Sequence, residues 1–427
     1  MGERLITFLT GDAPAQTDEK GVSEVVVPTV ERSTLGFNFE RREEGKPIIK
    51  VIGVGSGGLR ACERMVEDAL TDVSFVAVGT DQRSLGKVRA DMMVLLGRDG
   101  GGVAGDVDKG REAAEGAVDT IKGLFGDGVS MVFVVAALGG GTGTGAAPVI
   151  AREARRGGVL TVSIVTLPFR YEGNVRLRNA LRGLEDVRKN SDAVMVLDYE
   201  AILKRFPEMS LHEGFGMGGD VIKEAIESVV EIINTEGYVN VDLNDVLAVL
   251  QGGGRAIITT ARGSGVGRVT KAIRDALNSP LLRNGDENAW HRMLLNLSYD
   301  EGASTLMVSE VDELTDFLKG YSKRMSWMKY GIINNDKSLG ADAKVTLIVA
   351  EEPFLRGRDE KEGAPASEDV YNPLYAALYG RHEAKRHYYV FRPVAMDNDE
   401  VINLVSETPT FGRSAQIIST INSFLKK

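Results

Sequence analysis

The amino-acid sequence predicts an α/β protein, with a doubly wound parallel sheet, a long central helix and then a smaller α+β second domain. Two patterns lead to this prediction. Between 48 and 198, short apolar runs rich in β-branched residues alternate with segments of helical spacing, which is typical of a parallel sheet with helices on both faces. A long amphipathic stretch at 220–237 then separates this region from a second series of strands and helices.

The composition limits the class of protein. The 427 residues are enough for two or three domains, and 43% of them are hydrophobic, as in ordinary globular proteins. The formal net charge of −10 argues against a general nucleic-acid-binding protein, which would need a basic face for the phosphates. No apolar run reaches 18 residues, and Cys62 is the single cysteine. We therefore expect a cytoplasmic protein with neither a transmembrane segment nor an intrachain disulfide.

The strands and helices of the first domain, which we place at 48–218, follow in a regular order. Residues 1–47 show no lasting periodicity and are interpreted as an N-terminal extension. Buried strands are expected at five apolar runs, 48–55, 73–80, 130–138, 160–167 and 192–198. Helices are expected at 60–70, 146–156 and 175–190. In a doubly wound sheet, ligands bind at the carboxyl ends of the strands.

The stretch at 220–237 is predicted to be a helix that bridges two domains. We assign 219–253 to this helix and the loop and helix after it, 254–353 to the second domain, and 354–427 to a linker and tail. The apolar residues of the bridging helix fall on one face, and they are Ile222, Ala225, Ile226, Val229, Val230 and Ile233. In the second domain we expect strands at 255–263, 292–299, 328–336 and 344–352, with helices at 269–278 and 311–322.

Two glycine-rich loops each follow a predicted strand and precede a predicted helix. The first, GVGSGG at 53–58, fits the G-x-G-x-x-G dinucleotide fingerprint, and Asp81 lies roughly where the ribose-binding acid of a dehydrogenase would be. A nicotinamide-dependent oxidoreductase is therefore one alternative. The second loop, GGGTGTG at 139–145, argues against it, because one dinucleotide site needs only one such loop.

The second loop has the composition of an anion site. Glycines let backbone amides approach phosphate oxygens closely, and the amides at a helix N-terminus attract an anion. Thr142 and Thr144 add hydroxyl donors. A flexible turn is the alternative interpretation of the glycine run. The chain has no G-x-x-x-x-G-K-[ST] motif, so it is not a P-loop enzyme.

The GGGTGTG loop and several ordered motifs around it resemble the FtsZ branch of the tubulin/FtsZ superfamily, from about 48 to 350. IKVIGVGSGGLRACERM is similar to the first nucleotide loop of that family, FVAVGTDQRSL to the second and GGGVAGDVDKGREAAE to the third. GGGTGTGAAPVIA resembles the fourth loop, VTLPFRYEGNVR the fifth and NVDLNDV the catalytic loop after the central helix. The resemblance implies a cell-division GTPase that binds GTP or GDP with Mg²⁺ and polymerises head to tail into protofilaments.

The resemblance also implies roles for individual residues. The loop after the central helix of one subunit would complete the hydrolytic site of the next, with Asn240, Asp242 and Asp245 as catalytic residues. Spacing alone favours Asp242 and Asp245 as a helix cap, and the two roles are compatible. For Glu172 and Arg176, which would meet ribose and phosphate, an exposed ion pair is the alternative. The residues that would bind nucleotide are Gly55, Ser56, Gly57, Gly58, Arg60, Asp81, Gly102, Val103, Ala104, Gly105, Gly139, Gly140, Gly141, Thr142, Gly143, Thr144, Gly145, Glu172, Arg176, Tyr199, Phe215, Gly219 and Asp220.

The sequence departs from the family where the base would bind. The family's PND after the sixth strand is Asp-Tyr-Glu at 198–200, and Gly219 stands at the position of the Asn or Asp that reads guanine. A structural or regulatory paralogue, which binds nucleotide poorly and acts as a scaffold, is therefore the second hypothesis. The carboxylates of Asp198 and Asp220 remain as candidate acceptors for guanine. The rings of Tyr199 and Phe215 remain to stack on the base.

The tail carries one further motif. ETPTFGR at 407–413 resembles the short C-terminal peptide by which FtsZ proteins bind adaptors, and an incidental proline turn is the alternative. Apolar residues recur at helical spacing between 414 and 427, as in an amphipathic helix that binds a partner or a membrane surface, or in one that packs on the core. We therefore expect 407–427 to bind a division protein or membrane adaptor, in addition to the self-association of the main domains.

Overall fold

The structure of the protein is a computed structural model. It describes residues 26–27, 48–67, 73–126, 128–200, 208, 210–252, 254–279, 290–334 and 336–351. The rest of the predicted N-terminal extension and the whole of the predicted linker and tail lie outside these residues.

Eleven strands are present in the described part of the chain. Seven of them precede residue 200, namely β1 (Val26–Val27), β2 (Ile48–Val54), β3 (Val73–Gly79), β4 (Met92–Leu95), β5 (Val129–Ala137), β6 (Leu160–Leu167) and β7 (Ala193–Asp198). Four follow it, namely β8 (Gly254–Gly263), β9 (Trp290–Tyr299), β10 (Trp327–Ile333) and β11 (Ala343–Glu351).

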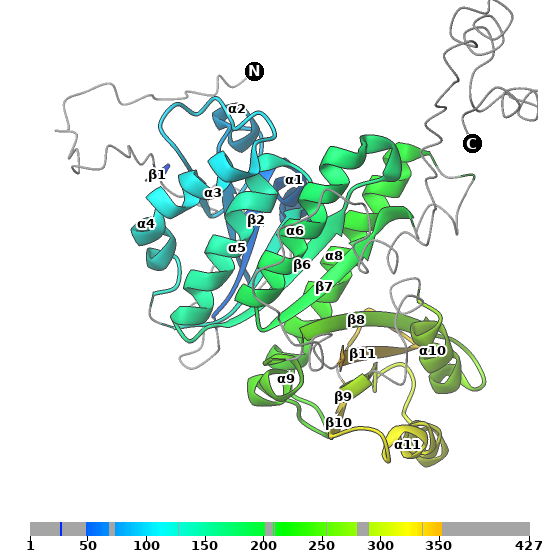
Figure 1. The fold of residues 1–427 in the computed structure, drawn as a ribbon. Helices are drawn as coiled ribbons and strands as arrows, with labels where there is room; N and C mark the ends of the chain where they lie inside the picture. The colour runs from blue at the N-terminus through cyan, green and yellow to red at the C-terminus, as the bar shows by residue number, and fades with distance from the viewer. Residues whose placement is uncertain are drawn as a thin grey trace, which may run out of the picture. The chain divides into compact units, whose positions relative to one another are not determined.

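The strand order is β1-β4-β3-β2-β5-β6-β7-β8-β11-β9-β10 (Figure 1). Every neighbouring pair from β4 to β8 is parallel, which confirms the predicted parallel sheet. β11 lies antiparallel between β8 and β9, and β10 pairs in parallel with β9. All nine predicted strands are present, and the prediction missed β4 and the two-residue β1, which pairs with β4.

In the described part of the chain, helices lie on both sides of residue 200. Those before residue 200 are α1 (Gly55–Glu67), α2 (Gln82–Leu85), α3 (Val107–Gly116), α4 (Val118–Gly123), α5 (Gly141–Arg156), the 3₁₀ helix η2 (Arg170–Glu172) and α6 (Asn174–Asn190). Those after it are α8 (Leu211–Asn234), α9 (Leu243–Leu250), α10 (Arg268–Leu277) and α11 (Val308–Tyr321).

Helices cover both faces of the parallel sheet. Met131, Phe133 and Val135 of β5 belong to one buried core with residues of α1 and α8. Their neighbours Val132 and Val134 are equally buried and point to the opposite face, since successive side chains of a strand alternate. On that face α5 packs against β5 and β6, with α3 and α6 beside it (Figure 1).

The central helix α8 is longer than the sequence prediction. It begins at Leu211 rather than near 220, because Ser210 and Glu213 form a capping box in which each side chain accepts a hydrogen bond from the other's backbone amide. The glycine-rich segment between these residues and 220 lowers the helical propensity, which explains the error. The predicted apolar face is confirmed, since Ile222, Ile226 and Val229 are fully or almost fully buried.

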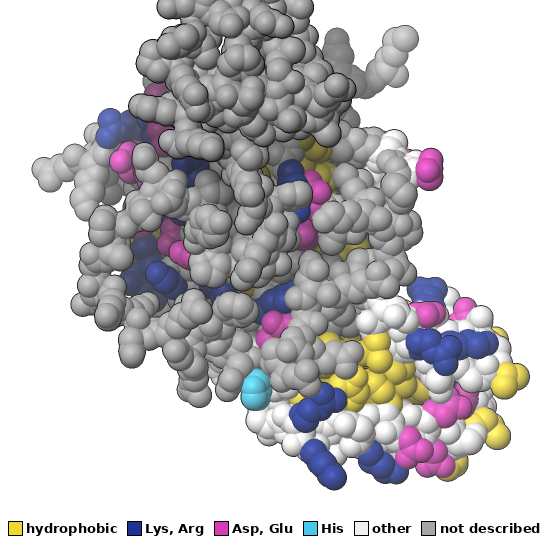
Figure 2. Space-filling view, turned by 45° about the vertical axis from the view of Figure 1, so that its right-hand side comes forward, with side chains coloured by type: hydrophobic (Ala, Val, Ile, Leu, Met, Phe, Trp, Pro, Cys, Tyr) yellow, Lys and Arg dark blue, Asp and Glu magenta, His cyan; other side chains and the backbone are white. Residues whose placement is uncertain are grey.

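The second half has its own buried core between its strands and the helices α10 and α11. On the described surface of this half, basic and acidic side chains are interspersed, as Figure 2 shows. None of the helices within the described ranges is long and apolar enough to cross a membrane.

A largely buried ion triad links α8 to the second half. Lys344 of β11 donates to Glu231 of α8 at 2.6 Å and to Asp336 at 2.8 Å, and the three side chains are only 13%, 19% and 14% exposed. Burial favours a raised pKa for Asp336, but hydrogen bonds from Lys344 and Ser338 outweigh it and lower the pKa. Stability from this group is therefore complete above its unfolded pKa of about 3.9 and is lost as the pH falls through the folded value.

Replacing Lys344 with methionine is expected to lower the free energy of unfolding by about 3–5 kcal/mol, because Glu231 and Asp336 would become uncompensated buried charges. Urea denaturation at pH 7, followed by circular dichroism, measures this change. Lys319→Met is the matched control, since Lys319 and its partner Asp316 are 74% and 71% exposed and such pairs contribute about 0–1 kcal/mol. Equal effects of the two substitutions would contradict the role of the triad.

Candidate functional site

The first glycine loop is pressed against the neighbouring strand. β2 ends at Val54, and α1 begins at Gly55 with a φ of 67°. A Cβ atom at Gly58 would lie 2.2 Å from the carbonyl oxygen of Val135, and one at Gly57 would lie 2.3 Å from the Cβ of Ala137. The absence of a side chain is therefore a packing requirement at both positions.

The second glycine loop joins β5 to α5 in the same way. A Cβ atom at Gly143 would lie 2.4 Å from the carbonyl oxygen of Ala137. Gly140 is the residue before the helix and provides no side-chain cap for its first amides. A Cβ atom at Gly140 would have no heavy atom within 4 Å. The start of α5 therefore presents backbone amides beside open space, as an anion site requires.

The structure brings the first, second, third and fourth predicted nucleotide loops into contact with one another. Gly55 of the first loop packs closely on the fourth loop, since a Cβ atom at Gly55 would lie 2.9 Å from the amide nitrogen of Gly143. The hydroxyls of Thr80 and Thr142 are 2.7 Å apart, which joins the second loop to the fourth. The amide of Gly102 in the third loop donates to Thr80 at 2.9 Å. These loops therefore form one continuous surface at the carboxyl ends of β2, β3 and β5.

The third loop contains unusual backbone geometry. Ala104 has a φ of 49° and is the one residue other than glycine in the described ranges with a positive φ. This conformation costs roughly 1–2 kcal/mol for an L-residue. Its neighbours Gly102 and Gly105 both have a φ of 81°, and all three residues are exposed or partly exposed. The loop thus exposes its backbone in a shape that must be stabilised by the contacts around it.

The side chains of Thr144 and Asp81, like that of Thr142, already form hydrogen bonds within the loops. Thr144 is completely buried, and its hydroxyl accepts a hydrogen bond from the amide of Gly139 at 2.8 Å. Asp81 caps α2, where it accepts from the amide of Arg83 and the hydroxyl of Ser84. These bonds lower the pKa of Asp81, the one from Ser84 most. Thr144 therefore holds the loop together, whereas Thr142 is partly exposed.

Glu172 and Arg176 lie beside the fourth loop. Their side chains form the expected ion pair, with 2.5 Å between Nη1 and Oε2, although the side chain of Glu172 is only 22% exposed. The other carboxylate oxygen of Glu172 accepts from the amide of Phe169. The backbone of Arg176 packs closely on Gly139, since a Cβ atom at Gly139 would lie 3.0 Å from the carbonyl oxygen of Arg176. Arg176 is 57% exposed, so the pair can also reach a ligand on the loop surface.

Aromatic rings gather at the carboxyl ends of β6 and β7. Phe169 stacks on Tyr171 with ring centroids 5.0 Å apart and on Tyr199 with centroids 5.4 Å apart. Burial raises the pKa of the Tyr199 hydroxyl. A Cβ atom at Gly218 would lie 2.2 Å from Cε1 of Tyr199, so this ring packs directly against Gly218, the residue before the predicted Gly219. The side chain of Phe215 lies outside the described residues.

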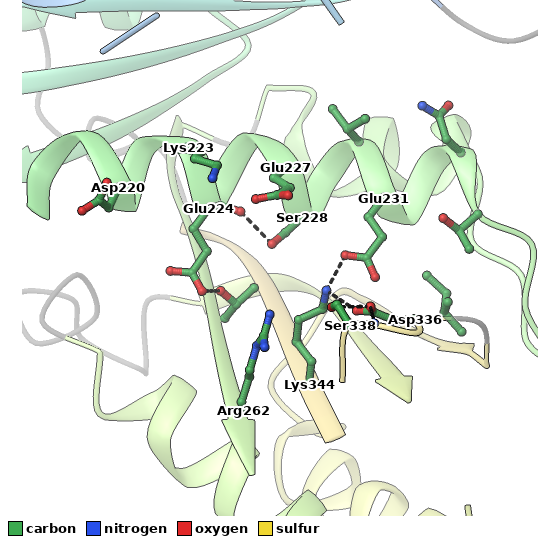
Figure 3. A pocket seen from close by; sticks show the side chains of 15 residues that line it. Asp220, Lys223, Glu224, Glu227, Ser228, Glu231, Arg262, Asp336, Ser338 and Lys344 are labelled. Atoms are coloured by element: carbon green, nitrogen blue, oxygen red, sulfur yellow. Dashed lines mark hydrogen bonds and ion pairs between the residues drawn. The ribbon is translucent and has the colours of Figure 1, made fainter. Parts of the chain in front are cut away.

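Asp220 is exposed and lines a polar cavity of about 590 Å³ that runs along α8 (Figure 3). Charged side chains of α8, β8 and β11 border the cavity, among them Glu224, Arg262 and Lys344. None of the glycine-loop residues lines it. The cavity is therefore separate from the loop surface.

Asn240 and Asp242, two of the predicted catalytic residues, lie between α8 and α9, and Asp245 lies in the first turn of α9. We call residues 235–245 the carboxylate loop. Asn240 accepts from the amide of Gly237 at 2.8 Å. Asp242 and Asp245 form a reciprocal capping box at the start of α9, so the cap interpretation is confirmed. Lys329 of β10 also donates to Oδ2 of Asp245 at 2.5 Å. The sequence reasoning missed Lys329, because no spacing rule relates residues so far apart in the chain.

The glycine loops and the carboxylate loop cannot form one site within a single chain. Tyr199 contacts the N-terminal part of α8 at Gly218, whereas the carboxylates follow its C-terminal end. The 24 residues of α8 span about 36 Å at 1.5 Å per residue. In the described residues, no cluster of three or more His, Cys, Asp or Glu side chains could hold a metal ion by itself.

The glycine loops at the ends of a parallel sheet, with a long helix leading to a second domain, define the class of GTPase domain shared by tubulin and FtsZ. A model of the Tubulin/FtsZ family GTPase domain matches residues 48–206, and one described as FtsZ, C-terminal, matches residues 383–426. The chain is also 34% identical over 423 residues to the cell division protein FtsZ of Porphyromonas gingivalis, covering 91% of this chain and 90% of that protein. The chain belongs to the FtsZ family.

Other relatives give the same result. Cell division protein FtsZ 1 of Thermococcus kodakarensis is 34% identical and covers 83% of this chain and 88% of its own length. The FtsZ dimer of M. jannaschii matches with a TM-score of 0.63 and 32% identity, over 72% of this chain and 89% of that one. A CetZ2 protofilament structure from Haloferax volcanii matches with a TM-score of 0.60 and 22% identity, over 78% of this chain and 96% of that one. At this identity the match shows the shared fold alone.

Gly143→Ala is expected to destabilise the protein by about 1–3 kcal/mol, because the new methyl group would overlap the carbonyl oxygen of Ala137. Gly140→Ala is the matched control, since its methyl group would enter open space, and it should change stability by less than about 1 kcal/mol. Thermal unfolding monitored by circular dichroism compares the two variants. A similar loss in both would show that glycine is needed for chain flexibility rather than for close packing.

Proposed function

We propose that this protein is a GTP-binding cytoskeletal protein of cell division, which assembles head to tail and hydrolyses GTP where two subunits meet. Family membership supports GTP binding, and the relatives named above are cell division proteins. The observation that carries the shared site is the separation of the glycine loops from Asp242 and Asp245 by the length of α8. One copy supplies the phosphate-binding surface, and the next supplies the carboxylates. A cytoplasmic location at the division site is part of this proposal.

The loop surface has the chemistry to bind a nucleotide. The amides at the start of α5 and the exposed backbone at 102–105 face the phosphates, with Thr142 as a hydroxyl donor. Arg176 neutralises phosphate charge, and Glu172 accepts from the ribose. Ser56, Arg60 and Asp81 border the same surface. Gly219 adjoins the base and Tyr199 stacks on it, whereas Asp220 lines the separate cavity along α8.

A magnesium ion would bind together with the nucleotide. Mg²⁺ is usually held by one or two carboxylates, waters and the substrate's phosphates rather than by a cage of protein ligands. The described residues fit this arrangement, since they contain no cluster of three or more metal-binding side chains, while the incoming Asp242 is exposed. The ion would supply charge neutralisation at the phosphates, and removal of divalent ions should abolish hydrolysis.

Asp242 has the exposure and charge of a residue that activates water. Its carboxylate is exposed, and a carboxylate within hydrogen-bond reach of a water can accept its proton. Asn240 is exposed two residues earlier and orients the same water. Asp245 is less exposed, at 15% of its side chain, and completes the pair of carboxylates.

A scaffold with weak GTPase activity is the second candidate function. The ring of Tyr199 is packed against Gly218 and Phe169, and a purine would have to share or displace this ring. A tyrosine carries a single hydroxyl, whereas a carboxamide can bind guanine with a separate carbonyl acceptor and NH₂ donor. Weak discrimination between GTP and ATP, together with slow turnover, would favour the scaffold.

Asp242→Asn is expected to reduce GTP turnover by at least about 100-fold without preventing folding, because asparagine caps a helix as well as aspartate but cannot act as a base. Phosphate release is measured over a range of protein concentrations, alongside light scattering for assembly. The parent protein should show a threshold concentration, above which turnover per subunit rises. Turnover in the parent that is constant with dilution would contradict a site shared between subunits.

Mixing two inactive variants tests the sharing directly. Gly140→Ala places a methyl group where the phosphates would bind but leaves the carboxylate loop intact, whereas Asp242→Asn has the opposite defect. In a 1:1 copolymer with random order, about a quarter of the head-to-tail contacts combine two intact halves. Activity should therefore recover to about a quarter of the parent value. A mixture of Asp242→Asn with the double variant serves as the control, because it contains no intact contact.

We also propose that residues 407–427 bind a division protein or membrane adaptor. The FtsZ, C-terminal, family match at 383–426 includes the ETPTFGR motif. A fluorescent peptide of residues 407–427 should bind an FtsZ adaptor from a related organism, with at least about tenfold loss for Phe411→Ala, because a buried aromatic anchor typically carries over 1 kcal/mol of binding energy. Vesicles of anionic lipid test the alternative, direct membrane binding. Absence of binding to both would refute the proposal for the tail.

A further inference from the structure

The carboxylate loop contacts one strand of the second half, β10, at several points. The amide of Ile332 donates to the carbonyl of Val239 at 3.0 Å, and these residues form an isolated antiparallel bridge. A Cβ atom at Gly237 would lie 2.1 Å from the carbonyl oxygen of Ile332, and one at Gly331 would lie 2.6 Å from Cγ2 of Val241. The loop is therefore joined to β10 by one antiparallel bridge and by close packing at Gly237 and Gly331.

Lys329 extends this attachment to the second carboxylate. Its ammonium nitrogen lies 2.5 Å from Oδ2 of Asp245, and the same oxygen accepts the amide of Asp242 at 3.0 Å. The side chain of Asp245 is 15% exposed and that of Lys329 is 38% exposed. Lys329 and Gly331 are two residues apart and share one face of β10. This face therefore holds the loop by shape at Gly331 and by charge at Lys329.

The ion pair has two physical consequences for Asp245. It fixes the carboxylate in one orientation, because Oδ2 is held by a side chain from β10 and by the backbone of its own loop. It also compensates one of two negative charges that lie only three residues apart, and that would otherwise repel each other and the phosphates of a nucleotide. A neutral residue at 329 would leave Asp245 without this partner.

We propose that Lys329 is a positioning residue of the shared hydrolytic site, which acts through Asp245. This inference rests on the proposed function, since it requires that Asp242 and Asp245 face the nucleotide of the neighbouring subunit. Lys329 holds the head of α9 against β10, so that the capping box presents both carboxylates in a fixed geometry. It does not itself need to contact the nucleotide.

The substitution Lys329→Met removes the charge but keeps the length of the side chain, and Lys329→Arg keeps the charge. In full-length protein with GTP and Mg²⁺, we expect Lys329→Met to lower turnover per assembled subunit by about 10- to 100-fold, as for a displaced catalytic group. The threshold concentration for assembly should stay within about twofold of the parent, and Lys329→Arg should recover most of the turnover. In an Asp245→Asn background, Lys329→Met should cause no further loss, because both changes remove the same interaction.

Lys319→Met is the control for loss of a lysine in the second half, since Lys319 pairs with Asp316 on the exposed side of α11. It should behave as the parent protein does. If Lys329→Met does not fold, Lys329→Gln replaces it, with the same expected loss of turnover. Parent-like turnover in the folded variant, or a loss fully explained by failure to assemble, would overturn the inference. A parent protein that assembles but does not hydrolyse GTP would overturn the proposed function as well.

Discussion

The burial of one face of α8 is the constraint on which the rest of the structure depends. Ile222, Ile226 and Val229 lie in a core shared with α1 and with the strands β2, β3 and β5, so the helix cannot shift along its axis without opening that core. The glycine loops are fixed at one end of the helix and the carboxylate loop at the other. The proposed division of one site between two copies rests on this geometry, since a continuous helix does not bend back on itself.

The polar side of the same helix is arranged around lysines of the second half. Lys344 lies between Glu231 and Asp336, and Lys329 holds Asp245 at the start of the next helix. In both places a carboxylate from the α8–α9 region meets a lysine from β10 or β11. Hydrophobic burial fixes the position of α8, and these ion pairs fix which groups of the two halves face each other.

Most of the fold could be predicted from the sequence, because apolar runs and helical periodicity are local signals. Every strand predicted from an apolar run is present. The start of α8 was predicted too late, because glycines obscured a helix that the capping box at Ser210 and Glu213 initiates. Among the candidate site residues, Asp242 and Asp245 form the capping box that their spacing indicated. The place of Thr144 in the motif predicts that it binds the ligand, whereas in the structure its hydroxyl accepts a hydrogen bond from the amide of Gly139.

The sequence by itself determined the order of the nine predicted strands and of the helices predicted between them, the two glycine loops and the position of the carboxylate pair after the long helix. These features depend on residue type and spacing over a few turns of chain. Only the tertiary structure decided which side chains meet across long separations, such as Lys329 with Asp245 and Tyr199 with Gly218. The physical reason is that sheet register and helix packing set such contacts, and neither is encoded in the spacing of the residues that touch.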